Sequence, residues 1–157
     1  MAFWQTLELK PDAKPRIAKV YLQSPEALTA MKKEFDKFRE YGFVIEGSST
    51  WSVPSFAIKK KDAGYRIATK FRYLNSQLVP VMFLISDLKM VVANKTIFSK
   101  FDVEAFYSIG VREKDWHLLC TGTSFGSFLY TVVPMGLTAS PSVMTRCMNA
   151  LFITHIR

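Results

Sequence analysis

The residue of greatest chemical interest in this sequence is an aspartate at the end of an apolar stretch. Asp102 follows residues 96–101 (TIFSKF), a run that is typical of a buried strand. An ionised carboxylate beside a core must be paired, hydrogen-bonded or bound to a metal. Mg²⁺ prefers oxygen ligands and is commonly held by one or two carboxylates together with substrate phosphates. Asp102 is therefore either a metal ligand or a structural group, such as a helix N-cap or the partner in a buried ion pair.

The distribution of acidic residues restricts the metal hypothesis. The chain has thirteen Asp and Glu residues, and the last of them is Asp115. A two-metal site for phosphoryl transfer, with ions about 3.5–4 Å apart, needs more than one carboxylate. Asp102 cannot hold such a pair alone, so we expect the remaining acidic ligands outside these 157 residues. His117 and His155 have no partner at ligand or triad spacing, and both are predicted to be structural or surface residues.

A cluster of cations occupies residues 59–72, where Asp62 is the single acid. Because side chains alternate along a strand, one face of a hairpin there would present several cations to phosphates, and Arg binds phosphate bidentately. The alternative, which the sequence supports equally well, is a solvated edge hairpin whose lysines prevent edge-to-edge pairing. The cations are Lys59, Lys60, Lys61, Arg66, Lys70 and Arg72.

The segment VPMGLTASP at residues 133–141 also has two interpretations. Gly136 would let the backbone approach a ligand closely, and Pro141 would start a helix. The alternative is an ordinary connection between a strand and a helix.

Local signals predict the elements that must position these groups. Residues 1–23 are predicted to be an extended lead-in segment. Ser24 and Pro25 predict a helix start, and Gly42 predicts its end. Residues 53–61 and 65–71 are predicted to be strands of a β-hairpin. The apolar face of the helix is predicted to hold Leu28, Met31, Phe35 and Phe38.

The second half of the chain predicts further short elements. Residues 73–93 are mixed, with a short helix near Asp87, and residues 96–103 are predicted to be a strand followed by a short helix or turn at 104–110. Residues 115–133 predict two strands around a glycine-containing turn, and Ser140-Pro141 opens a final helix. This order favours an α+β fold over alternating βαβ units.

Composition predicts one folded domain with an anionic partner. The chain is 49% hydrophobic and 14% aromatic, and its net charge is +8. Such a charge favours a polyanion or an anionic membrane surface as partner. The most apolar window, residues 78–92, is interrupted by Pro80, Asp87 and Lys89, which excludes a membrane span there. Neither a signal peptide nor a disulfide framework is indicated, so reduced thiols and an intracellular location, in cytoplasm or nucleus, are predicted.

The motifs occur in an order that resembles reverse transcriptases, above all those of gypsy-type long-terminal-repeat retrotransposons. The similar segments are residues 49–75 (STWSVPSFAIKKKDAGYRIATKFRYLN), 98–109 (FSKFDVEAFYSI) and 128–149 (FLYTVVPMGLTASPSVMTRCMN). The resemblance covers nearly the whole chain. It implies a single α+β domain with an antiparallel sheet and packed helices. Residues 1–95 would form the fingers with a lead-in, and residues 96–157 a partial palm with a return to the fingers.

The resemblance implies a catalytic role for Asp102 as the first catalytic aspartate and a ligand of two Mg²⁺ ions. The backbone of Val103 would help to bind the second ion. Lys60 and Arg66 would grip the triphosphate of an incoming dNTP, and Tyr107 would screen the 2′ position of its sugar.

Further residues are implied to contact the nucleotide or the template. Met135 and Gly136 would line the nucleotide pocket. Arg72 and Asn75 match the R-x-L-N positions and would be structural or template-related, while Pro141 would start the helix beside the template.

The sequence departs from the family pattern at three places. Lys70 stands where the family usually has Asp in its D-[YF]-R run, and Glu104-Ala105 replaces the usual polar-small pair. The Tyr-x-Asp-Asp hairpin that should follow the final helix does not occur before Arg157. We therefore expect a truncated piece of a polymerase that extends a primer on an RNA or DNA template. The piece alone would have negligible activity, and whether it is itself an enzyme stays open.

Two other functions remain. One is a non-catalytic module, derived from a retrotransposon, that binds nucleic acid. The other is a protein-interaction module that self-associates through the exposed surface of the truncated palm. The expected partners are a template-primer and dNTP, without a membrane.

Overall fold

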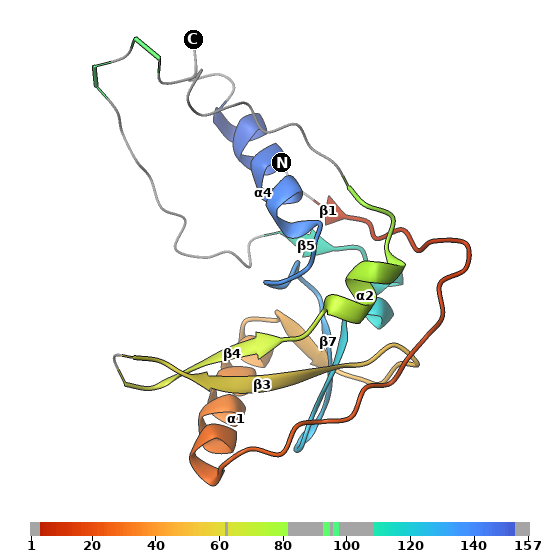
Figure 1. Cartoon of the computed structure of the whole chain (residues 1–157), viewed down its shortest axis with the longest axis vertical. Helices are drawn as coiled ribbons and strands as arrows, with labels where there is room; N and C mark the ends of the chain where they lie inside the picture. Colours follow the sequence, from red (N-terminus) through yellow and green to blue (C-terminus); the bar gives the residue numbers. More distant parts are fainter. Residues whose placement is uncertain (1–3, 62, 82–92, 95, 98–108, 153–157) are drawn as a thin grey trace.

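The described part of the chain contains short strands, three α-helices and a 3-10 helix. The computed structural model describes residues 4–61, 63–81, 93–94, 96–97 and 109–152. The predicted α+β class is confirmed, and Figure 1 shows how the elements are arranged. In chain order they are β1 (Trp4–Gln5), α1 (Pro25–Glu40), β2 (Val44–Glu46), β3 (Val53–Lys59), β4 (Tyr65–Thr69), α2 (Arg72–Gln77), β5 (Gly110–Val111), η1 (Glu113–Leu119), β6 (Cys120–Thr123), β7 (Gly126–Tyr130) and α4 (Ser140–Phe152).

The strands form two sheets. The larger has the order β2-β7-β6-β3-β4 and is antiparallel except between β3 and β6, where Val53 pairs with Thr121 and Pro54 with Gly122. The smaller consists of the parallel strands β1 and β5. In Figure 1, α1 lies against the β3–β4 part of the larger sheet, and α4 lies beside β1 and β5. The larger sheet thus combines strands from both sides of the domain subdivision predicted near residue 95.

Helix α1 forms as its sequence signals predict. The Ser24 hydroxyl accepts a hydrogen bond from the Ala27 amide (3.2 Å), which satisfies one of the free N–H groups of the first turn. Pro25 occupies the first turn, and Gly42 follows the helix with φ of +70°. The buried face of the helix consists of Ala27, Met31, Phe35 and Phe38.

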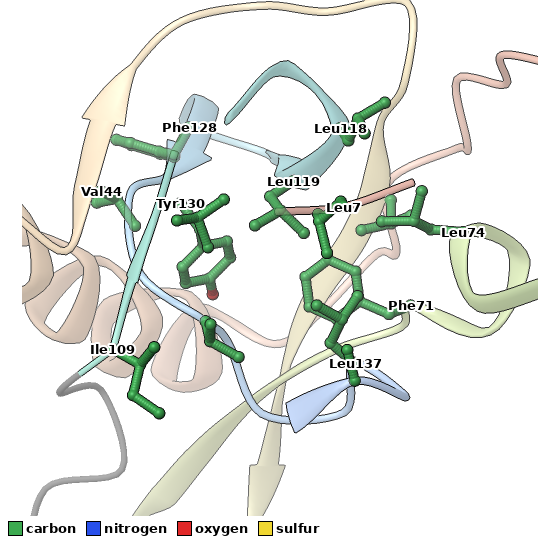
Figure 2. Close-up of a cluster of buried hydrophobic side chains, with 14 of the residues drawn as sticks. Leu7, Val44, Phe71, Leu74, Ile109, Leu118, Leu119, Phe128, Tyr130 and Leu137 are labelled. Atoms are coloured by element: carbon green, nitrogen blue, oxygen red, sulfur yellow. The ribbon is translucent and has the colours of Figure 1, made fainter. Parts of the chain in front are cut away.

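The core joins segments that are far apart in sequence. The Phe35 ring of α1 lies 4.9 Å from the Phe128 ring of β7, measured between ring centroids. Figure 2 shows Phe71 and Tyr130 within the same cluster of buried side chains, with their ring centroids 6.2 Å apart. The other labelled members of this cluster are Leu7, Val44, Leu74, Ile109, Leu118, Leu119, Phe128 and Leu137.

The predicted hairpin is confirmed, with strands shorter than predicted. In β3 and β4, Ser55 pairs with Thr69 and Lys59 with Tyr65. The turn between them has positive φ at Ala63 (75°) and Gly64 (85°). The turn follows Lys59 directly, so β3 ends at Lys59 and not at residue 61 as predicted.

The strand predicted to start at residue 115 is wrong over its first five residues. Residues 113–119 form η1 instead, and β6 starts at Cys120. The buried carboxylate of Asp115 accepts a hydrogen bond from the Leu7 amide (3.0 Å), and Trp116 donates its indole N–H to Val111 O (2.8 Å). These contacts with β5 and the lead-in hold the segment in a tight helical turn.

Four elements of the structure were not predicted, and three predicted segments fall wholly or partly outside the described residues. Helix α2 and strands β1, β2 and β5 were missed because they are short and their partners are distant in sequence. The predicted helix near Asp87 and the segment 104–108 lie outside the described residues, as do residues 98–103 of the predicted strand. The first two residues of that strand, Thr96 and Ile97, are in no regular element.

The two cysteines are buried and unpaired with each other. Burial raises the pKa of the Cys120 thiol, so the neutral form packs as a small apolar group. In the described part of the chain, no helix has the length and apolarity needed to cross a membrane.

Replacing Gly42 by Ala should destabilise the fold by about 1 kcal/mol, because a residue with a Cβ is strained at positive φ. A Cβ at this position would meet no atom within 4 Å, so the cost is conformational and not steric. Urea unfolding measures it. Gly42→Asn is the control and should cost less, since Asn tolerates this conformation better. Equal stability of wild type and Gly42→Ala would contradict the explanation.

Candidate nucleic-acid interface

One face of the β3–β4 hairpin carries three of the predicted cations. Arg66 lies opposite Ile58, and Lys60 follows Ile58 by two residues, so Lys60 and Arg66 share a face. Lys70 lies on this face too, because its amide donates to Pro54 O (3.0 Å) and continues the strand register. The opposite face is turned to the protein, since Ala57 and Ile67 pack against the core. The structure therefore directs Lys60, Arg66 and Lys70 to the exposed face.

The lead-in segment, drawn in red and orange in Figure 1, runs past α2 and then beside β3 to reach α1. Its backbone pairs with Ser52: the Ser52 amide donates to Arg16 O, and the Ala18 amide donates to Ser52 O (both 2.9 Å). Further along, the Gln23 side chain accepts from the Ala57 amide (2.6 Å). These bonds place the lead-in cations beside the hairpin.

A pocket of about 660 Å³ lies between the lead-in, β3 and α2. Its walls carry four cations, Arg16, Lys19, Lys70 and Arg72. We call this hollow the cation pocket. Ser52, Val53, Pro54 and Ser76 complete the lining with Ile17, Ala18, Tyr21 and Tyr73. Among the described residues, none that lines the pocket is acidic.

Two tyrosines hold cations of the pocket in place. The Lys70 Nζ donates to the Tyr21 hydroxyl (3.0 Å) and lies 5.7 Å from the centroid of its ring. The Arg16 guanidinium lies 5.2 Å from the centroid of the Tyr73 ring. The Tyr21 ring also makes an edge contact with Phe56, with centroids 5.4 Å apart. The pocket therefore combines positive charge with partly exposed aromatic rings.

Charge neutralisation distinguishes this pocket from a second hollow. The ion pairs found between described residues all belong to α1 and β2, and none involves the four cations of the pocket. The second hollow, of about 560 Å³, lies along the exposed side of α1, where Asp36 and Glu40 accompany its three lysines. The cation pocket is the better site for a polyanion, because its positive charge is not offset locally.

Asn75 acts as a clamp between α2 and the loop that precedes α4. Its side-chain amide donates to Gly136 O and accepts from the Thr138 amide, both at 2.9 Å. Gly136 has φ of +90°, and a Cβ there would lie 3.6 Å from Thr69 O at the end of β4. Asn75 and Gly136, predicted from separate motifs, are thus brought together, and Asn75 has a structural role.

Two other predicted residues lie near this clamp. Met135 is 56% exposed and lies directly before Gly136. Pro141 occupies the first turn of α4, as predicted. The hydroxyl of Ser140, however, is buried and donates to Pro134 O (2.8 Å), so it fastens the preceding loop.

The proposed metal ligands Asp102 and Val103 lie outside the described residues, as does Tyr107. Among the described residues, no group of three or more His, Cys, Asp and Glu side chains is close enough to hold a metal ion. His117, predicted to be a structural or surface residue, is exposed.

Sequence reasoning missed the lead-in half of the cation pocket. Arg16, Lys19 and Tyr21 belong to a segment without periodicity, and their relation to Lys70 exists only after the lead-in pairs with Ser52. The one available signal was the recurrence of basic residues in an otherwise irregular segment.

Asn75→Asp should lower the free energy of unfolding by about 1 kcal/mol, because a carboxylate oxygen replaces the group that donates to Gly136 O. Urea unfolding measures the change. Asn149→Asp makes the same chemical change on the exposed side of α4 and should stay within about 0.5 kcal/mol of wild type. Similar losses in both variants would argue against the clamp.

No family model matches the chain. Among curated proteins, it is 27% identical over 135 residues to the Transposon Tf2-3 and Tf2-4 polyproteins of Schizosaccharomyces pombe. The match covers 83% of this chain and 10% of each polyprotein. The chain therefore spans about a tenth of the length of these relatives.

Solved structures with the same fold include the protease-reverse transcriptase of Prototype Foamy Virus. The native protein superposes with a TM-score of 0.75 at 18% identity, covering 95% of this chain and 22% of that one. Its CSH mutant gives a TM-score of 0.77 at 19% identity, with coverages of 96% and 22%. The chain is thus similar in sequence to retrotransposon polyproteins and has the fold of a reverse transcriptase domain.

Proposed function

We propose that this chain is part of a reverse transcriptase of the gypsy type, and that the cation pocket and the hairpin face bind the nucleic acid on which the polymerase acts. The observation that supports this most directly is the cation pocket itself. Its volume is about 660 Å³, and the described residues that line it include four cations and two tyrosines but no acid.

A single nucleic-acid strand fits the chemistry of this pocket. Its phosphates are attracted by the cations, and Arg16 and Arg72 can bind them bidentately. Unpaired bases stack on aromatic rings such as Tyr21 and Tyr73, which a duplex cannot do without opening. Such binding depends on charge and stacking, so it is tolerant of sequence, as a polymerase template site must be.

The hairpin tip is proposed to bind the triphosphate of a dNTP. Lys60 and Arg66 share the exposed face, and Arg66 lies about 13 Å along the strand from Lys70. This spacing separates a nucleotide site at the tip from a strand site at the base. Met135 and Gly136 are proposed to line the nucleotide pocket, and Tyr107 to screen the sugar.

Mg²⁺ is proposed as the cofactor of the intact polymerase, with Asp102 and the backbone of Val103 among its ligands. The ion would supply electrostatic stabilisation to the transferring phosphoryl group. The chain's own cations would bind and orient the primer-template and the dNTP, which converts the joining of the primer 3′-hydroxyl to the dNTP into a reaction between positioned groups.

An intracellular location and self-association stay predictions. Exposed apolar side chains suited to self-association include Leu22 in the lead-in and Leu151 in α4.

Binding of a labelled single-stranded oligothymidylate, followed by fluorescence anisotropy between about 50 and 200 mM salt, tests the proposed interface. The affinity should fall steeply with salt. In the double variant Lys19→Gln/Lys70→Gln, the slope of log affinity against log salt should decrease by about 1.4, since each phosphate contact contributes about 0.7.

Lys32→Gln/Lys33→Gln is the matched control, because it removes the same charge from α1. It should leave the slope nearly unchanged. Equal effects of the two double variants would indicate attraction by net charge alone and would refute the pocket as the interface.

Primer extension with Mg²⁺ and dNTPs separates an enzyme from a binding module. The 157-residue chain has no acid after Asp115 and so lacks the second carboxylate set that the resemblance implies. We expect salt-dependent binding without detectable extension. Loss of the metal ligands would lower the rate by several powers of ten, since each tenfold in rate corresponds to about 1.4 kcal/mol of barrier. Robust template-directed extension by this chain would show that its own acids suffice.

A further inference from the structure

Four hydroxyl groups form a continuous chain across the larger sheet, and three of them belong to buried residues while Thr69 is half-buried. The Thr69 hydroxyl lies 3.1 Å from the Tyr130 hydroxyl and 2.6 Å from that of Ser55. The Ser55 hydroxyl lies 2.7 Å from that of Thr121, which donates to Val53 O (2.9 Å). Ser55 and Thr121 are fully buried, and Tyr130 is 2% exposed. We call this series the hydroxyl chain.

The direction of every bond in the hydroxyl chain follows from proton counting. Each hydroxyl has one proton, and a carbonyl oxygen can only accept. Thr121 gives its proton to Val53 O, so it accepts from Ser55. Ser55 must then accept from Thr69, and Thr69 from Tyr130. The protons therefore all point one way, from β7 through β4 and β3 to β6, an arrangement in which neighbouring bonds strengthen one another.

The hydroxyl chain lies where the sheet has its weakest backbone connection. Only two residue pairs, Val53 with Thr121 and Pro54 with Gly122, join the hairpin to β6. Moreover, β7 and β4 are separated by two strands in the sheet order, about 14 Å if the sheet were flat. The bond between Tyr130 and Thr69 bridges this interval and ties the outer strand of the hairpin to the other half of the sheet.

Thr69 connects the hydroxyl chain to the cation pocket. Its side chain points inward to the hydroxyl chain, and that of the next residue, Lys70, points outward into the pocket. The orientation of β4 at Thr69 therefore sets the direction of Lys70 and, further along the strand, of Arg66. Apolar packing is not directional, whereas four hydrogen bonds in series admit one geometry.

We propose that the hydroxyl chain is a positioning device that holds the β3–β4 hairpin, with Arg66 and Lys70, at a fixed angle to the rest of the sheet. Thr69 and Ser55 are its positioning residues. The consequence for nucleic-acid binding rests on the proposed function, but the effect on the hairpin itself does not.

Thr69→Val tests the proposal, because it keeps the side-chain shape and removes the hydroxyl. The variant removes both hydrogen bonds of the Thr69 hydroxyl, the one with Tyr130 and the one with Ser55. Amide hydrogen exchange in β3 and β4 should become about tenfold faster, and exchange in α1 should stay as in wild type. Affinity for the labelled oligothymidylate should weaken by about tenfold.

Three further variants make the test specific. Thr69→Ser retains the hydroxyl and should restore exchange and affinity to near wild type. Ser55→Ala interrupts the same chain and should reproduce the Thr69→Val effects, with little addition in the double variant. Thr29→Val removes a hydroxyl that donates to Pro25 O within α1, and it should leave the hairpin unchanged.

The outcomes separate this proposal from the proposed function. Uniformly faster exchange throughout Thr69→Val would reveal a loss of global stability and overturn the positioning role. The positioning role would also be overturned if hairpin exchange in Thr69→Val equalled that of wild type. The same holds if wild type binds the oligothymidylate with salt dependence and Thr69→Val binds it with equal affinity. If wild type binds no oligothymidylate while hairpin exchange responds as expected, the proposed function fails and the positioning of the hairpin stands.

Discussion

The rest of the structure depends on the short parallel pairing between β3 and β6. It connects Val53 and Pro54 to Thr121 and Gly122, and these two parts of the chain are 68 positions apart in sequence. The hairpin and α1 belong to one side of this junction, and β6 and β7 to the other. The Phe35–Phe128 contact closes the core over the same junction from the side of α1. Because so few backbone bonds make the connection, side chains must supply the remaining stability.

The cation pocket forms next to the same junction and shares residues with it. Its floor includes Ser52, Val53 and Pro54, which lie at the start of β3, and the lead-in reaches them by pairing with Ser52. Unlike α1, where acids and lysines alternate and form ion pairs on the surface, the pocket gathers cations without an acid. Keeping like charges together costs free energy unless an anion binds, and this is the physical basis for proposing the pocket as an anion site.

Elements with strong local signals could be predicted, and those that depend on distant partners could not. Ser24, Pro25 and Gly42 are sufficient to delimit α1, because capping and positive φ are properties of a few neighbouring residues. The turn at Ala63–Gly64 likewise marks the hairpin. By contrast, no local signal shows that Asp115 will accept from the Leu7 amide, and this contact replaces the predicted strand with a 3-10 helix. Asp102, Val103 and Tyr107 lie outside the described residues, so the chemistry assigned to them stays a prediction.

For this protein, residue order alone was enough to predict the α+β class, the hairpin with its cations and the resemblance to reverse transcriptases. Each of these depends on local propensity or on motifs that are contiguous in the chain. Tertiary structure decided which cations act together: Lys60 and Arg66 lie along the exposed face, while Lys70 and Arg72 join Arg16 and Lys19 around one pocket. It also decided that Ser55, Thr69, Thr121 and Tyr130, unremarkable in sequence, form one hydrogen-bonded chain. The physical reason is that charge density and hydrogen-bond geometry depend on distances in space, which long-range strand pairing sets.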